Sequence, residues 1–222
     1  MRIRFALVTE GSSDRGLVAH LEDLCVRAGA VEVEGVAPDL AALPEPPGKK
    51  VADQVRAALQ LVPGAQLVFV HRDADHADDV LAQRDIAGGI AKVEGCPPHV
   101  PVVPIQELEA WLLTDEPAIR TVAMNPGGSS PLGLPKASRI ESTAHPKERL
   151  ASALVAACNF SGRRLEKFRS SFPRNRAILL ERLDIDGVVS KLPAWQRLVQ
   201  DTTEAVKIVL TEQLLRRDPG PT

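Results

Sequence analysis

Short apolar runs alternate with amphipathic stretches through the first half of the chain. Four runs have the length and β-branched content of strands, at residues 2–8, 31–36, 66–70 and 99–105. In the third run four consecutive apolar residues, 67–70, leave no polar face. This pattern is typical of a strand that is buried on both sides in a parallel sheet.

Residues between these runs repeat apolar side chains at helical spacing. Helices are predicted from Ser12 or Ser13 to about Gly29, over 50–61, and over 77–92 with an interruption near Gly88 and Gly89. A βαβαβαβ order predicts an α/β fold, with a mainly parallel four-stranded sheet flanked by helices. The fourth run contains Pro101 and Pro104, which favours an edge position.

The second half of the chain has a different pattern. Residues 114–146 are rich in Pro, Gly and Ser, which predicts a mobile loop. Pro146 suits the first turn of a helix that continues to about Cys158, and a last helix is predicted over 193–217. The expected organisation is therefore an α/β core over 1–113, a loop over 114–146, and a helical C-terminal region over 147–222 that packs on the core.

Acidic side chains follow three of the predicted strands. They are Glu10 after the first, Asp73 and Asp75 after the third, and Glu107 and Glu109 after the fourth. Ligands of open α/β sheets bind outside the carboxyl ends of the strands, and neighbouring carboxylates there favour a cation between them. Mg²⁺ or Mn²⁺ suits such oxygen ligands. The alternative for each acid is a solvated loop residue or a helix cap; for Asp14, in the first helical turn, interaction with the helix dipole is the preferred interpretation.

Charge is distributed unevenly, although the net charge is only −2. Residues 1–111 carry 10 Lys and Arg against 17 Asp and Glu, whereas residues 112–222 carry 17 against 12. The densest basic tract has one acid, Glu166, among six cations that are candidates for binding nucleic acid: Arg163, Arg164, Lys167, Arg169, Arg174 and Arg176. A solvated helix face is the alternative interpretation.

Several classes of protein are disfavoured by the sequence. The three cysteines form no CxxC pair, so neither a zinc site nor a disulfide framework is indicated. No apolar run is long enough to cross a membrane and no signal-peptide pattern begins the chain, which predicts a cytoplasmic protein. There is no Walker A pattern, so an associated ATPase would be a separate chain.

These motifs resemble the Toprim superfamily, in which a Glu follows the first strand and Asp-x-Asp follows a later one. Glu10-Gly11 and Asp73-Ala74-Asp75 match that pattern. The run from Thr9 to Asp14 looks like the opening of the Toprim domains in OLD-type nucleases. The run 106–111 is similar to a signature of an uncharacterised Toprim-like family that is often encoded beside ATPases. That family tends to have His at the position of Gln106.

The resemblance covers about residues 3–150 and implies phosphodiester chemistry that depends on Mg²⁺. It implies metal ligands among the acids above, Glu10 as general acid or base, and a catalytic lysine for which Lys136 and Lys147 are both candidates. A self-contained topoisomerase is excluded because the chain has no tyrosine.

The expected function is a metal-dependent nuclease on DNA or RNA, as a phage-defence effector with a separate ATPase. A non-catalytic Toprim-fold module that binds nucleic acid or the ATPase, and a phosphohydrolase of small substrates, remain as alternatives.

Overall fold

The structure is a computed structural model that describes residues 1–76 and 78–217. The chain forms two compact units. Unit 1 contains Met1–Arg72, Val80–Val102 and the segment from Arg197 onward, and unit 2 contains Asp73–Asp79 and Val103–Gln196. These units cut across the segments 1–113, 114–146 and 147–222 that composition indicates, because each unit is assembled from stretches far apart in the sequence.

Unit 1 is built on a four-stranded sheet in which every pairing is parallel, as predicted. The strands are β1 (Arg2–Val8), β2 (Glu32–Val36), β3 (Leu67–His71) and β4 (His99–Val102). Their order is β2-β1-β3-β4, so the proline-containing β4 is an edge strand, as its sequence indicates. The pairing of Val8 with Val70 brings the carboxyl ends of the two central strands to the same edge of the sheet.

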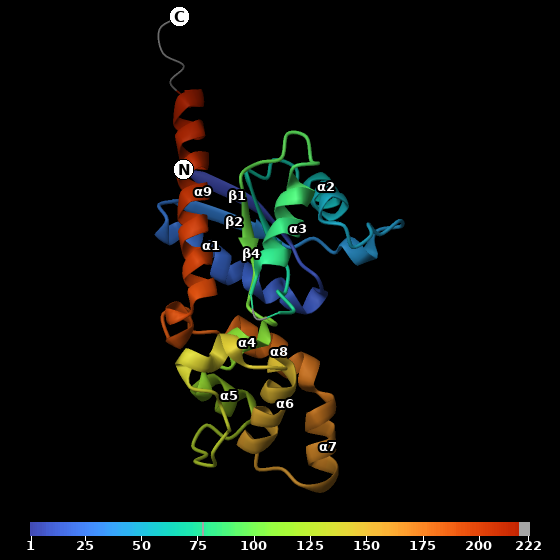
Figure 1. The fold of residues 1–222 in the computed structure, drawn as a ribbon, viewed down its shortest axis with the longest axis vertical. Coiled ribbons are helices and arrows are strands. Elements are labelled where there is room, and N and C mark those ends of the chain that lie inside the picture. The colour runs from blue at the N-terminus through green and yellow to red at the C-terminus, as the bar shows by residue number, and fades with distance from the viewer. Residues whose placement is uncertain (77, 218–222) are drawn as a thin grey trace, which may run out of the picture. The chain divides into compact units, whose positions relative to one another are not determined.

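Helices cover both faces of this sheet (Figure 1). They are the short 3-10 helices η1 (Ser12–Gly16) and η2 (Leu40–Ala42), the helices α1 (Leu17–Arg27), α2 (Val51–Leu61) and α3 (Val80–Ile90), and the part of α9 (Pro193–Arg217) that follows Gln196. In Figure 1, α2 and α3 lie on one face, and α1 and α9 lie on the other. The bounds of α9 are those predicted, whereas the first residue of the predicted helix 77–92, Ala77, lies outside the described residues.

The core of unit 1 depends on close contacts around the central strands. Phe5 of β1 and Phe69 of β3 meet edge to face, with ring centroids 4.9 Å apart. Gly35 of β2 makes room for this packing, because a Cβ atom there would lie 2.3 Å from Cζ of Phe5 and 2.8 Å from Cγ1 of Val18. The glycine is therefore required by packing rather than by backbone conformation.

Helix α3 runs without interruption through Gly88 and Gly89, in contrast to the predicted break. The two glycines have different surroundings. A Cβ atom on Gly88 would have no neighbour within 4 Å, whereas one on Gly89 would lie 2.5 Å from Cβ of Val51 at the start of α2. Because α3 packs closely against α2, position 89 requires glycine, although glycine is a poor helix former.

This contrast gives a matched pair of substitutions. We expect Gly88→Ala to raise the free energy of unfolding by up to about 1 kcal/mol, because alanine is the better helix former. Gly89→Ala should lower it by about 1–3 kcal/mol, because Val51 is β-branched and stiff and cannot move aside without strain. Chemical denaturation of both variants checks the prediction, and effects of the same sign would contradict it.

Unit 2 is helical. Its elements are α4 (Glu109–Leu112), α5 (Glu116–Val122), η3 (Ala137–Ser142), α6 (Pro146–Ala157), α7 (Gly162–Ser170), α8 (Phe172–Glu181), η4 (Val188–Lys191) and the first turn of α9. Trp111 and Trp195 meet edge to face in its interior, with centroids 4.9 Å apart. The backbone N–H of Ala194 donates to Glu141 Oε1 at 2.9 Å, which ties the start of α9 to η3.

Residues 114–146 are not the continuous loop that their composition predicts, since they contain α5 and η3. Asp115 caps α5 by accepting a hydrogen bond from Ala118 N at 2.8 Å, and Pro117 occupies the first turn. The side chain of Arg120 is almost fully buried and donates to Ser130 O at 2.8 Å, which fixes the following turn. The sequence contains the Asp-Glu-Pro pattern that starts α5, but the many Gly and Pro residues that follow it favour the prediction of a loop.

Within residues 1–76 and 78–217, no helix combines the length and the apolar character needed to cross a membrane.

Candidate acidic site

In unit 1, Glu10 follows β1 and is exposed. Its Oε1 atom lies 3.8 Å from Nε of Arg72, the residue that follows β3. Arg72 is only 8 % exposed, and it also donates to His71 O at 2.9 Å and to the Gln54 side chain. Burial lowers the pKa of the Arg72 guanidinium, and the negative charges of Glu10 and Asp85 oppose that shift. A buried arginine therefore lies beside the first predicted site residue.

A second ionisable pair lies nearby in unit 1 and was not found from sequence. The buried side chains of Asp14 and His71 approach each other, with Oδ2 and Nδ1 3.5 Å apart. Ser13 Oγ donates to the other carboxylate oxygen of Asp14 at 3.2 Å. In the sequence Asp14 has the pattern of a helix-dipole residue and His71 follows the predicted strand 66–70. Only the parallel pairing of β1 with β3 brings their segments together.

The loop after β1 borders a pocket of about 330 Å³ within unit 1. Glu10, Gly11 and Ser12 line one part of it, and Arg15, Asp39 and Gln54 line another. Arg15 forms an ion pair with Asp39 at 2.8 Å and holds the pKa of that carboxyl below its usual value. The wall of the pocket therefore carries both acidic and basic side chains.

In unit 2, Asp73 and Asp75 lie in a loop held by backbone hydrogen bonds. Asp73 Oδ1 accepts a hydrogen bond from Leu108 N at 2.8 Å. Asp75 N donates to Gln106 O at 2.9 Å, and Gln106 N donates to His76 O at 3.2 Å. Asp75 and Gln106 have φ values of 55° and 64°, which are costly for residues with a side chain. Strained residues in a hydrogen-bonded loop are often found at functional sites.

The acids that follow β4 are both engaged within unit 2. Glu107 Oε2 accepts the backbone N–H of Lys147 at 2.9 Å, in the first turn of α6. Glu109 is only 3 % exposed, and its Oε1 accepts a hydrogen bond from Nε of Arg176, itself 7 % exposed, at 2.7 Å. We therefore assign Glu109 and Arg176 to the interior of unit 2, rather than to the metal ligands and nucleic-acid contacts predicted from sequence.

The two candidate lysines are exposed. Lys147 is connected through its backbone to Glu107, whereas Lys136 precedes η3. The remaining predicted nucleic-acid contacts, Arg163, Arg164, Lys167, Arg169 and Arg174, are also exposed, and they are divided between α7 and α8. Their exposure is the condition for phosphate contact, and the contact itself stays a prediction.

Among residues 1–76 and 78–217, no three or more His, Cys, Asp or Glu side chains are arranged as ligands of one metal ion. The donor chemistry still suits Mg²⁺ at Asp73 and Asp75, because this ion is usually held by one or two carboxylates and fills its other positions with water and phosphate oxygens. Asp75 is exposed and Asp73 is half-buried at the carboxyl end of β3. These two acids are the residues that fit the predicted ion best.

Comparisons of the chain with models of known protein families, with curated proteins and with solved structures found no match.

Proposed function

We propose that the chain is a phosphodiesterase that cleaves DNA or RNA and depends on Mg²⁺ or Mn²⁺. The observation that carries the proposal is the Asp73-Ala74-Asp75 loop, which follows a central strand of an all-parallel sheet and is held in a strained conformation by backbone hydrogen bonds. Glu10 follows the neighbouring central strand, in the order that the Toprim resemblance requires.

In this proposal Asp73 and Asp75 hold the ion, and Glu107 holds the first turn of α6 through the backbone N–H of Lys147. The ion would supply neutralisation of the charge on the phosphate oxygens. Glu10 serves as general acid or base, and Lys147 or Lys136 stabilises the charge that develops on the leaving group. Arg72 supports Glu10, since its largely buried guanidinium is fixed by His71 O and keeps a positive charge beside the Glu10 carboxylate.

The experiment that tests the proposal is cleavage by the purified chain of linear DNA and RNA, with Mg²⁺ or Mn²⁺ and with a chelator. Cleavage that requires the metal and is inhibited by long nucleic acid, but little by a small phosphoester, supports a nuclease. Preference for the small phosphoester would instead favour a phosphohydrolase.

A second candidate function is a non-catalytic module that binds nucleic acid or a separate ATPase. It is favoured by one observation, that the described residues contain no preformed set of three metal ligands. Binding of nucleic acid without cleavage at any metal concentration would select this candidate. If the chain needs the ATPase, cleavage should appear only after the ATPase is added.

Metal binding can be measured without a substrate. We expect Mg²⁺ or Mn²⁺ at a hundred times its dissociation constant to stabilise the native state by about 2.7 kcal/mol, since a ligand that binds only the folded chain stabilises it by mass action. Thermal unfolding with and without metal should show the rise, and Asp75→Asn should remove it.

The matched control for this measurement is Glu94→Gln. Glu94 is exposed in the turn between α3 and β4, at the opposite ends of the strands, and the change removes the same charge. Equal metal-induced shifts in Asp75→Asn and Glu94→Gln would show that the ion is not bound by the Asp73-Ala74-Asp75 loop.

A further inference from the structure

Unit 2 contains a hollow of about 540 Å³ that we call the basic pocket. Its wall carries four cationic side chains, from Arg164 and Lys167 of α7, Arg174 of α8, and Arg182 at the end of α8. Among the residues that the structure describes, no Asp or Glu lines it. This volume falls in the range of about 300–1,000 Å³ that is typical of sites for small organic ligands.

The four cations have no carboxylate partner within the part of the chain that the structure describes. The guanidinium of Arg164 instead lies over the ring of Phe160, 3.8 Å from its centroid. Like charges gathered around one hollow repel one another, and a bound anion removes that cost. The charge therefore favours a ligand with one or more phosphate groups.

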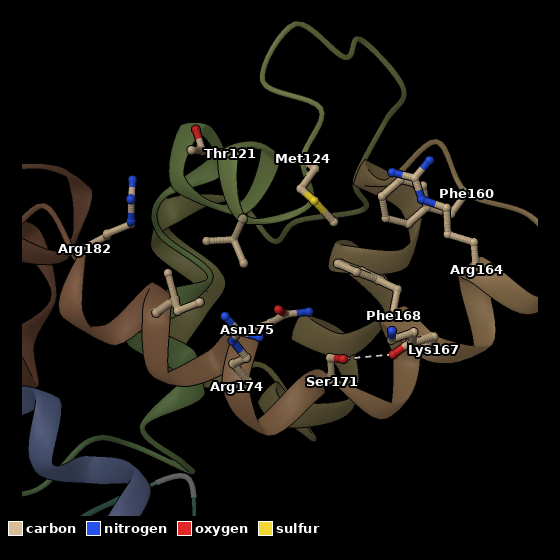
Figure 2. A pocket seen from close by; sticks show the side chains of 12 residues that line it. Thr121, Met124, Phe160, Arg164, Lys167, Phe168, Ser171, Arg174, Asn175 and Arg182 are labelled. Carbon is tan, nitrogen blue, oxygen red and sulfur yellow. Dashed lines mark hydrogen bonds between the residues drawn. The ribbon is translucent and has the colours of Figure 1, made fainter.

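The rest of the wall is apolar and aromatic. Val122, Met124, Phe168 and Ile178 line it together with Phe160. Figure 2 shows Thr121 and Met124 on one side of the hollow, and Phe160, Arg164 and Phe168 on another. Inorganic phosphate alone would leave this apolar surface exposed to water, so the ligand should also carry a flat or apolar group.

A buried amide adds an independent indication of a ligand. Asn175 lines the pocket and is 8 % exposed, and its Nδ2 atom is buried with no hydrogen-bond partner among the described residues. An unsatisfied buried donor costs about 1–3 kcal/mol. An acceptor on a ligand, such as a ring nitrogen or carbonyl of a nucleobase, would satisfy it after a small movement of the wall.

We propose that the basic pocket binds a nucleotide unit, with its phosphate on the cations and its base against Phe160, Met124 and the amide of Asn175. The unit has two possible sources with the same chemistry, a free nucleotide or the 5′-phosphorylated end of a single strand. This inference is independent of the proposed cleavage, because none of the predicted carboxylate ligands lines the pocket.

The test is calorimetric titration of the full chain, in the presence of a chelator, with ADP, pyrophosphate and a 5′-phosphorylated oligothymidylate. We expect ADP or the oligonucleotide to bind more tightly than pyrophosphate. Arg164→Gln/Arg174→Gln should weaken that binding by about tenfold or more, because charge-assisted hydrogen bonds to phosphate are lost. Because the chelator removes any metal, failure of cleavage and failure of nucleotide binding are separate results.

The matched control is Arg84→Gln/Arg139→Gln, which removes two exposed charges that lie outside the pocket wall and outside the predicted nucleic-acid contacts. A similar loss in this control would overturn the proposal, since general charge attraction would explain the binding. Asn175→Ala should weaken binding of the nucleotide and leave pyrophosphate unchanged.

Binding of ADP alone would identify a free nucleotide, and binding of the oligonucleotide alone would identify a strand end. Both results support the proposal. Equal binding of pyrophosphate, or no binding of any of the three probes, would overturn it.

Discussion

Arg176→Ala is expected to lower the free energy of unfolding by about 3–5 kcal/mol, because it leaves the Glu109 carboxylate buried without its partner. The hydrogen bond between Arg176 Nε and Glu109 Oε1 is 2.7 Å long, and it joins α8 to α4 across 67 residues of sequence. Urea denaturation followed by far-ultraviolet circular dichroism measures the change. This is the largest stability effect that we predict for any single substitution.

Arg174→Ala is the matched control, since Arg174 is exposed on the same helix two residues earlier. It should change the stability by less than about 0.5 kcal/mol. The double variant Glu109→Leu/Arg176→Met should recover most of the loss, because apolar groups of similar volume often replace a buried ion pair at little cost. A loss in Arg176→Ala no larger than in Arg174→Ala would show that the pair does not stabilise unit 2.

Asp73→Asn is expected to lower metal-dependent cleavage by about a hundredfold or more. Removing one carboxylate ligand weakens the stabilisation of charge in the transition state, and a loss of about 3 kcal/mol corresponds to that factor. The rate is measured as single-turnover cleavage of linear DNA or RNA at saturating Mg²⁺ or Mn²⁺. The amide oxygen of asparagine can still accept the hydrogen bond from Leu108 N, so the loop should keep its conformation.

Two further variants separate charge from structure. Asp73→Ala removes the acceptor for Leu108 N as well, so it should also lower the melting temperature, whereas Asp73→Asn should not. Glu94→Gln should cleave at the parent rate. If Asp73→Asn retains the parent rate while its melting temperature is unchanged, the Asp73-Ala74-Asp75 loop is not the site of metal-dependent chemistry.

Residues with strong local patterns were placed correctly from sequence. The apolar run that ends at Val70 identified β3, and the prolines of β4 identified an edge strand. The failures were at residues whose partners are distant in sequence. Glu109 follows a strand like the other acids, yet it pairs with Arg176 and belongs to the interior of unit 2.

The basic tract shows the same division. Its charge was evident from sequence, whereas its separation into a buried Arg176, exposed cations and a pocket wall was not. Arg182 and Asn175 were missed because one lies beyond the tract and the other carries no charge. The signal that selects them is the position of Asn175 next to Arg174 on α8 and of Arg182 at the end of that helix, which requires the helix bounds.

The sequence by itself determined the parallel α/β sheet of unit 1 and the last helix. The signals for them, short apolar runs and apolar residues at helical spacing, lie within single segments of the chain. It also determined that Glu10 and Asp73 follow the carboxyl ends of strands. Only the tertiary structure decided which charged groups are neutralised. A charged side chain is buried only where an oppositely charged partner meets it, and Arg176, the partner of Glu109, lies 67 residues away in the sequence.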